Sequence, residues 1–283
     1  MSKIVELFGH NIPSVPQEQW KEIVEEQICV YTNTKCFKVR KSEPEISIGT
    51  CTVNYGKEKR DIIICPKRLL QKKQVFTDCV HLLTKHEPGN EFHVVSEVNI
   101  PGGCIDYFLV SARDNKVKGF VGIEFQTLDT TGTVYPERQR LLKSFGIDVA
   151  EKDVASKKKF GMNWKMTAKT ILVQLHHKID TFEHIGKHLV LIVQDCFFDY
   201  MKKEFNFSHL SKPSKLGDSM HIHSYSLRKE SDYLKLNLSE ILSTDSQGIS
   251  TCLGLQAEAK VEFAEIIKSI EAKLSNNTLL TIV

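Results

Sequence analysis

Polar residues interrupt two strongly apolar segments near the middle of this chain. Asp106 lies within CIDYFLVSA, and Glu124 and Gln126 lie within GFVGIEFQTL. Side chains alternate between the two faces of a strand, so Glu124 and Gln126 would share a face. Charged groups seldom enter apolar strands unless they are paired or bind a metal ion. These three residues are therefore the first candidates for chemistry.

Three consecutive strands are expected to position these residues. Apolar alternation and turn residues predict strands over Phe92–Ile100, Cys104–Ala112 and Gly119–Leu128. Strands that follow one another in sequence usually pair. Asp106 and Glu124 would then converge at one edge of the sheet.

Two carboxylates and an amide could hold a magnesium ion, which prefers oxygen ligands and keeps several waters. Such an ion polarises a phosphate, generates hydroxide and stabilises the leaving oxygen, as phosphodiester hydrolysis requires. Glu97, on the preceding strand, could be a further ligand or a base. A buried ion pair would leave the same pattern in the sequence, so spacing alone leaves both interpretations open.

Four of the eight cysteines fall in the first quarter of the chain: Cys29, Cys36, Cys51 and Cys65. Four thiolates could bind zinc, iron or an iron–sulfur cluster and stabilise a region with little apolar mass. The spacing lacks the close CxxC pairs of zinc ribbons, and small buried thiols are the alternative. His221 and His223 share a strand face, but no third ligand is evident nearby. We interpret these two histidines as polar strand residues.

The remaining pattern predicts an α/β fold around a mixed sheet. Helices are expected over Gln17–Gln27, Pro66–His86, Pro136–Phe145, Met162–Lys178, Cys196–Phe205 and Glu258–Leu274. Further strands are expected within His184–Asp195 and at 221–228. Helices alternating with strands in this way favour a central sheet flanked by helices.

Composition and charge narrow the class of protein. The chain is 41% hydrophobic and 26% charged, which is ordinary for a globular protein and excludes collagen-like and disordered classes. Its apolar runs are too short to cross a bilayer and no signal pattern opens it, so we expect a cytoplasmic protein without a membrane partner. Residues 138–203 carry 13 Lys and Arg against 7 Asp and Glu, and residues 57–73 carry 7 against 2. These basic regions would suit a polyanion, although solvated faces look the same.

At this point the sequence resembles a known family. Asp106 followed by Glu124-Phe125-Gln126 resembles the PD-(D/E)xK nuclease motif, in the variant with Gln in place of Lys. The wider segment IDYFLVSARDNKVKGFVGIEFQTLDTTGT is similar to the NotI-type restriction endonucleases. The segments CFKVRKSEPEISIGTCTV and IICPKRLL are similar to that family's cysteine-rich region, and FGMNWKMTAKTILVQLHHK and HLVLIVQDCFFDYM also fit. The resemblance covers roughly residues 25–205.

The resemblance implies a type II restriction endonuclease, a magnesium-dependent homodimer that cuts double-stranded DNA at a palindromic site without a nucleotide cofactor. Asp106 and Glu124 would be the magnesium ligands, and Gln126 and Glu97 would complete the catalytic set. Structural iron, or zinc, would be held by the four-cysteine set. Residues 1–78 would form this cysteine-rich metal-binding region, and residues 79–283 the PD-(D/E)xK nuclease domain with a C-terminal extension.

Contacts with DNA are expected where a basic loop precedes a helix. Lys157 and Lys158 lie in that loop, and Asn163 and Lys165 open the helix, where amides and charges could bind phosphates. A helix start with no DNA contact is the alternative. The rival functions are a repair or junction nuclease of the same superfamily, or a metal-stapled DNA-binding module that has lost catalysis.

Overall fold

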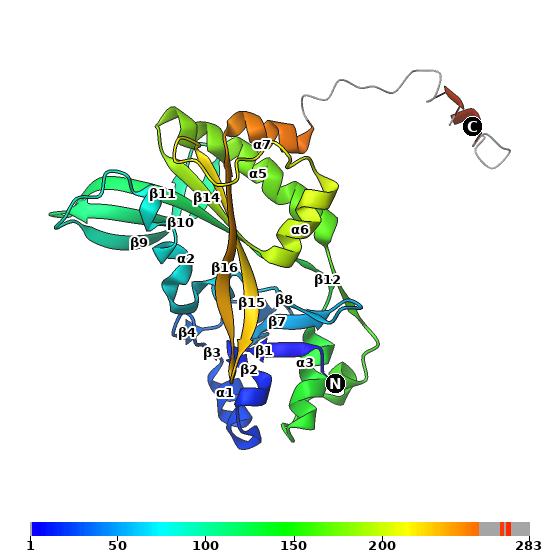
Figure 1. Ribbon diagram of the computed structural model, residues 1–283. Coiled ribbons are helices and arrows are strands. Elements are labelled where there is room, and N and C mark those ends of the chain that lie inside the picture. Colours follow the sequence, from blue (N-terminus) through cyan, green and yellow to red (C-terminus); the bar gives the residue numbers. More distant parts are fainter. Residues whose placement is uncertain (1, 255–266, 269, 273–283) are drawn as a thin grey trace, which may run out of the picture.

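A twisted six-stranded sheet forms the centre of the molecule (Figure 1). The computed structural model describes residues 2–254, 267–268 and 270–272. The strand order is β16-β15-β14-β11-β10-β9. The strands are β9 (Glu91–Ile100), β10 (Gly103–Arg113), β11 (Lys116–Gln126), β14 (His188–Gln194), β15 (Met220–Glu230) and β16 (Tyr233–Thr244).

The sheet is mixed. β9, β10 and β11 pair as an antiparallel meander, β14 pairs parallel to both β11 and β15, and β16 returns antiparallel to β15. The central strand β14 has the sequence HLVLIVQ and is buried along nearly its whole length, as expected for a parallel strand that is covered on both faces. The predicted mixed central sheet flanked by helices is confirmed.

Helices cover one face of the sheet, and short helical turns cover the other. α5 (Trp164–His184) and α6 (Asp195–Glu204) pack on the first face, and α7 (Ser246–Leu253) packs against α5. The second face is covered by η3 (Pro66–Lys73), α2 (Gln74–Thr77) and η4 (Val80–Leu82). The single helix predicted over Pro66–His86 is wrong. Positive φ angles at Lys72 (51°) and Lys73 (54°) break the helical path there.

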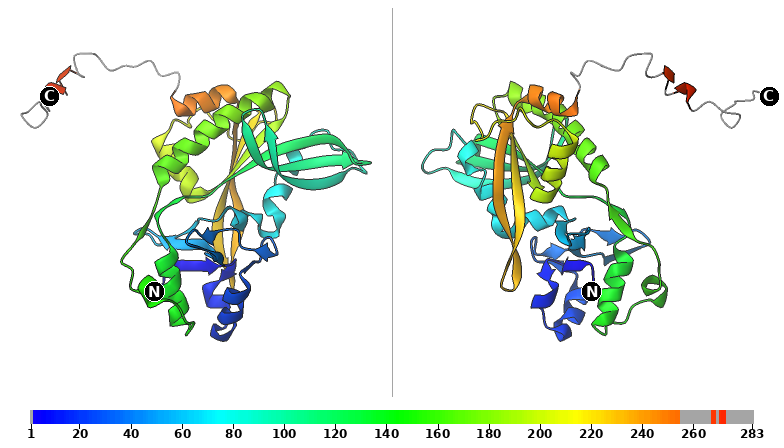
Figure 2. Two further views of the ribbon diagram at one scale, coloured as in Figure 1. Left: turned by 180° about the vertical axis from the view of Figure 1, so that it is seen from behind. Right: turned by 45° about the vertical axis from the view of Figure 1, so that its right-hand side comes forward.

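A smaller lobe packs below the main sheet (Figures 1 and 2). Its four-stranded sheet has the order β2-β1-β7-β8. The strands are β1 (Ile4–Leu7), β2 (His10–Asn11), β7 (Thr50–Tyr55) and β8 (Arg60–Ile63). Around them lie η1 (Ile12–Ser14), η2 (Gln17–Gln19), α1 (Trp20–Glu26), the hairpin of β3 (Ile28–Cys29) and β4 (Thr34–Lys35), and that of β5 (Val39–Arg40) and β6 (Glu43–Ser47).

The chain returns to this lobe after β11. β12 (Thr130–Gly132) pairs with β13 (Phe160–Met162), and α3 (Tyr135–Ser144) and α4 (Glu151–Val154) lie between them. The ring of Phe145 stacks on Trp20 with centroids 5.4 Å apart. The domain boundary near residue 78 stays a prediction, and the helix expected over Glu258–Leu274 lies outside the fully described residues.

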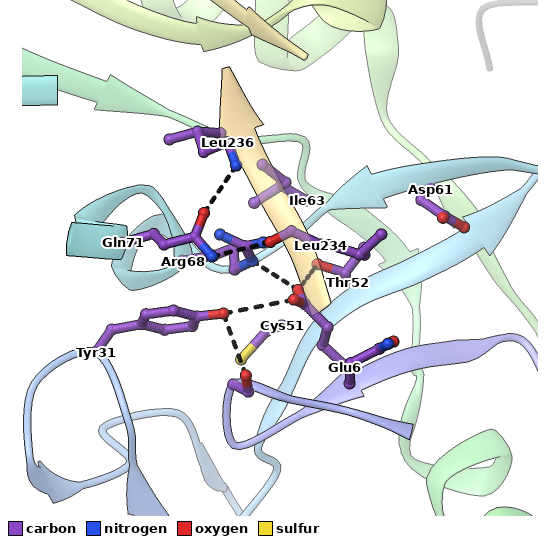
Figure 3. Close-up of polar contacts among 12 residues, drawn as sticks. Glu6, Tyr31, Cys51, Thr52, Asp61, Ile63, Arg68, Gln71, Leu234 and Leu236 are labelled. Carbon is purple, nitrogen blue, oxygen red and sulfur yellow. Dashed lines mark hydrogen bonds and ion pairs between the residues drawn. The ribbon is translucent and has the colours of Figure 1, made fainter. Parts of the chain in front are cut away.

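A buried ion pair joins the lobe to the main sheet (Figure 3). Nε of Arg68, in η3, lies 2.7 Å from Oε2 of Glu6, in β1, and both side chains are buried. The same carboxylate accepts a hydrogen bond from Thr52. Nη2 of Arg68 donates to the Leu234 carbonyl of β16 at 2.6 Å. One guanidinium therefore contacts both sheets.

Two glutamines reinforce the same junction. Gln71 donates to the Leu234 carbonyl at 2.9 Å and accepts from the Leu236 amide at 2.7 Å (Figure 3). Gln194, at the end of β14, accepts from the Ile63 amide at 2.8 Å and donates to the Asp61 carbonyl at 2.7 Å. The position of the lobe against the main sheet is thus set by directional hydrogen bonds as well as by apolar packing.

Buried histidines line the second face of the main sheet. His221 and His223 of β15 are almost fully buried, and Nε2 of His221 lies 3.0 Å from the Asp218 carbonyl. Burial and the neighbouring His188 lower the pKa of His221 to about 4, and burial and His221 lower the pKa of His223 to about 3. Both rings are therefore neutral in the fold. None of the described helices is long and apolar enough to cross a membrane.

Replacing Arg68 by Ala should destabilise the protein by about 3–5 kcal/mol, because Glu6 would be left charged and buried without a partner. The measurement is urea unfolding followed by circular dichroism. The control is Arg60→Ala, whose partner Glu58 is exposed, and which should change stability by less than about 1 kcal/mol. A loss for Arg68→Ala no larger than that of the control would show that the ion pair does not hold the lobes.

Stability should fall as the pH drops below about 6.5, the ordinary histidine pKa. Below that pH, His221 and His223 bind protons in the unfolded chain but stay neutral in the fold. Each histidine therefore lowers the free energy of unfolding by about 1 kcal/mol at pH 5.5. The effect is absent above pH 7. In the double variant His221→Gln/His223→Gln, the difference between the unfolding free energies at pH 5.5 and pH 7.5 should be smaller than in wild type. In His184→Gln, an exposed control, the difference should remain as in wild type. An equal pH dependence in all three proteins would contradict the assignment.

Candidate active site

The structure brings Asp106 and Glu124 together on neighbouring strands. The paired residues Tyr107 and Ile123 are directly opposite each other, so the next position along the ladder places Asp106 beside Glu124. Oδ2 of Asp106 accepts a hydrogen bond of 2.8 Å from the Phe125 amide. This contact fixes the Asp106 carboxylate against the backbone that carries Glu124.

Both carboxylates lie on the sheet face that α5 covers. Alternation along β11 sends Ile123 and Phe125 into the opposite core and leaves Glu124 facing α5. Asp106 is half-buried, whereas Glu124 is only 4% exposed. Burial and then the charge of Asp106 raise the pKa of Glu124 to about 7, against the opposing effect of Lys178. The two acids therefore repel each other in an apolar environment, and their negative charge requires a nearby cation.

Lys178 of α5 supplies that compensation. Its ammonium lies 2.8 Å from Oε1 of Glu124, and the lysine is 6% exposed. This ion pair is the contact that Oε1 makes, and no further hydrogen bond to this buried oxygen is found in the described part of the chain. The sequence interpretation missed Lys178. The available signal was its position on the apolar stripe of α5, with Ile171, Leu175 and Phe182.

Two glycines allow α5 to pack closely against the strands that carry the carboxylates. A Cβ on Gly122 of β11 would lie 2.3 Å from the Phe182 ring, and one on Gly102 would lie 2.3 Å from the His177 carbonyl. The turn after β9 is also tied to α5 by a hydrogen bond of 2.9 Å from Thr181 to the Pro101 carbonyl. The absence of side chains at these positions therefore permits the approach that places Lys178 over Glu124.

Glu97 and Gln126 lie beside this pair. Glu97 falls opposite Asp106, between the paired positions Ile105–Val98 and Tyr107–Ser96. It is exposed and its φ of 57° is rare for a non-glycine residue. The Gln126 amide donates to the neighbouring Thr127 carbonyl at 2.6 Å. Among the described residues, Glu97 forms no ion pair, and the Gln126 side chain hydrogen-bonds only to the adjacent backbone.

Lys67 is a second lysine near these acids. Its ammonium donates to the Tyr107 hydroxyl at 2.8 Å. Burial alone would lower its pKa, but this hydrogen bond and the charges of Glu97 and Asp106 raise it. Because Tyr107 packs in the core opposite α5, Lys67 reaches the carboxylates from the other side of the strand.

The predicted DNA contacts lie away from the carboxylates. Lys157 and Lys158 are exposed in the loop before β13, Asn163 precedes α5, and Lys165 is exposed in its first turn. Lys165 is 13 residues before Lys178, or about 20 Å along the helix. The structure thus places these four residues at the other end of α5, and their role stays a prediction.

The four cysteines of the predicted metal site lie in the small lobe, but they do not form a metal-binding group there. Cys29, Cys36, Cys51 and Cys65 are all buried in the small lobe. The neighbouring Cys51 and the charge of Lys38 lower the pKa of Cys65 to about 6, while Cys65 and burial raise that of Cys51. However, no group of three or more His, Cys, Asp or Glu is placed to hold a metal ion within residues 2–254 or the short described segments. The Cys51 thiol donates a hydrogen bond to the Gly49 carbonyl, at 3.4 Å. The predicted metal-stapled arrangement is therefore not found.

Comparison with known proteins agrees with the sequence resemblance. The model of the family described as restriction endonuclease NotI matches residues 21–215, which include both candidate carboxylates and the lobe cysteines. No curated protein matches the chain. Since the matched region covers more than half of the chain, the chain belongs to the NotI restriction endonuclease family and is a site-specific deoxyribonuclease.

Proposed function

We propose that this endonuclease hydrolyses DNA with magnesium bound by Asp106 and Glu124. The observation that carries the proposal is the buried Glu124 carboxylate, which lies beside the Asp106 carboxylate and is paired in the described residues with one lysine, Lys178. Burying such a group without a ligand is costly. Two carboxylates and waters satisfy magnesium, so the donor set fits this ion. When bound, the ion would polarise the scissile phosphate and activate water.

The chain's own residues would orient the reactants. The Phe125 amide holds Asp106 in place, and Lys178 lies against Glu124. Gln126 shares the strand face of Glu124 and is neutral, so we assign it to orient water rather than to supply charge. Glu97, exposed opposite Asp106, is assigned as a further ligand or base. These four assignments make the site a PD-(D/E)xK variant.

The basic loop and the start of α5 would bind the DNA backbone. Lys157, Lys158 and Lys165 are exposed cations, and Asn163 lies at the helix start, where amides point toward an anion. The distance of about 20 Å along α5 between Lys165 and Lys178 is roughly half of the 34 Å helical turn of B-DNA. These residues would therefore contact phosphates about half a turn from the cut and set its register.

We further propose a homodimer that acts on a palindromic site, because two symmetric active sites can each cut one strand. The outer edge of the main sheet supports this proposal. β9 has no partner strand on its free side among the described residues, and its exposed side chains include Phe92, Val94, Val95 and Val98. An apolar edge strand favours pairing with another chain. A second copy of β9, antiparallel to the first, would cover it symmetrically. The cytoplasmic location stays a prediction.

The four lobe cysteines are the proposed ligands of a structural iron or zinc ion. The proposal is supported by their chemistry and by their burial in one region of the small lobe. Small side-chain rotations would have to redirect the Cys51 thiol from Gly49. The ion would have no part in hydrolysis and would add to the stability of the lobe.

Glu124→Gln and Asp106→Asn should each lower the cleavage rate by at least about 10²–10³-fold while DNA binding persists. The assay incubates mixed-sequence plasmid DNA with each protein and with magnesium or EDTA, and separates the products on a gel. Wild type should give discrete fragments with magnesium and none with EDTA. Glu240→Gln, in a surface ion pair of β16, is the matched control and should cut like wild type. Cleavage by Glu124→Gln at the wild-type rate would contradict the site.

Elemental analysis of protein purified without chelators should find about one iron or zinc ion per chain. Cys36→Ser and Cys51→Ser should lose the metal and unfold at lower temperature. Cys252→Ser, a buried thiol in α7, should retain the metal. Wild-type protein without iron or zinc would refute the four-cysteine site and leave the catalytic proposal untouched.

A further inference from the structure

The active-site motif on β11 has no cation at the position two residues after Glu124. Position 126 is a glutamine, and its amide is occupied with the Thr127 carbonyl at 2.6 Å. A glutamine can donate hydrogen bonds but carries no charge. A site that binds a phosphodiester and two carboxylates gains from a fixed positive charge that stabilises the transition state. Beyond the proposed magnesium ion, a side-chain cation for this site would have to come from another element.

α5 supplies a lysine at the required place. Lysines are rarely buried, because the ammonium loses its hydration, yet Lys178 is only 6% exposed. Its sole ion-pair partner in the described chain is Glu124, at 2.8 Å. An ordinary structural lysine would extend to solvent, as Lys165 does on the same helix. The burial of Lys178 beside a candidate ligand therefore requires an explanation.

The surrounding backbone is shaped around this side chain. A Cβ on Gly103, the first residue of β10, would approach Cε of Lys178 to 3.2 Å, and one on Gly102, in the turn before it, would collide with the His177 carbonyl. Phe182 contacts β11 at Gly122, one helical turn away from Lys178. The turn and the strand thus confine the lysine to the carboxylate side of α5.

Lys67 does not meet the same requirement. Its ammonium is bound to the Tyr107 hydroxyl, and no carboxylate of the described chain lies within ion-pair distance of it. It also approaches from the sheet face opposite to α5. Of the two lysines near the site, only Lys178 shares a face with Asp106 and Glu124.

The geometry points to Lys178 as the catalytic lysine of this endonuclease, supplied by α5 in place of the strand lysine that Gln126 replaces. This inference rests on the proposed active site. In the hydrolysis, a water oxygen forms a bond to phosphorus and the bond from phosphorus to the leaving oxygen breaks. The attacking water gives up a proton to solvent or a base, and the leaving oxygen takes up a proton from solvent to become a hydroxyl. The Lys178 ammonium neither gains nor loses a proton. It donates a hydrogen bond to the phosphate or to the attacking water and stabilises the charge that develops there.

The test compares Lys178→Met, Lys67→Met and the exposed control Lys169→Met in single-turnover cleavage of plasmid DNA that wild type cuts into discrete fragments. DNA affinity without magnesium and melting temperature are measured in parallel. Lys178→Met should lose about 10²–10³-fold in rate with DNA affinity within about threefold of wild type. Lys169→Met should match wild type. Lys178→Arg should retain more activity than Lys178→Met because it keeps the charge.

A second variant separates catalysis from folding. Adding Gln126→Lys to Lys178→Met returns a cation to the strand position. The double variant should cleave at least about tenfold faster than Lys178→Met alone. A purely structural Lys178 would not be replaced in this way, so a failure to restore the rate in a folded protein overturns the inference. A rate for Lys178→Met equal to wild type, or a larger loss in Lys67→Met, also overturns it. Wild-type protein that cuts no DNA would instead refute the proposed magnesium site.

Discussion

The buried carboxylate of Glu124 is the constraint on which the rest of this structure depends. An ionised carboxylate in an apolar sheet is tolerated only with a cation beside it. The sheet therefore requires α5 to deliver Lys178, and α5 can approach only because β11 has Gly122 and the β9–β10 turn has Gly102. Loss of the cation partner leaves the carboxylate uncompensated. A magnesium ion would satisfy the same oxygen, which connects the stability of the sheet to its chemistry.

The second buried ion pair has a different role. Glu6 and Arg68 lie between the lobe and the main sheet, and Arg68 also binds the Leu234 carbonyl of β16 (Figure 3). The long ribbon of β15 and β16 reaches the lobe in all views of the molecule (Figure 2). The segment after β11 also enters the lobe before returning as α5, so the chain connects the lobe directly to the helix that carries Lys178.

The sequence predicted the central sheet and its acids because their signals are local. Alternation identified β9, β10 and β11, and sequential pairing predicted that Asp106 and Glu124 would meet. Lys178 was missed because its partner lies 54 positions earlier, although its place on the apolar stripe of α5 was an available signal. The helix predicted over Pro66–His86 failed because positive φ angles at two lysines leave no sequence signal. The four-cysteine metal site was not found among the described residues, because sequence spacing does not determine how thiols are arranged in space.

The most direct test of this account is a crystal structure of the protein with plasmid-derived duplex DNA and manganese as an anomalous substitute for magnesium. The account predicts an anomalous peak bonded to the carboxylates of Asp106 and Glu124, with the Lys178 ammonium at hydrogen-bond distance from the scissile phosphate or its attacking water. A peak bound by other residues, with Glu124 and Lys178 still paired and the DNA phosphate elsewhere, would contradict it.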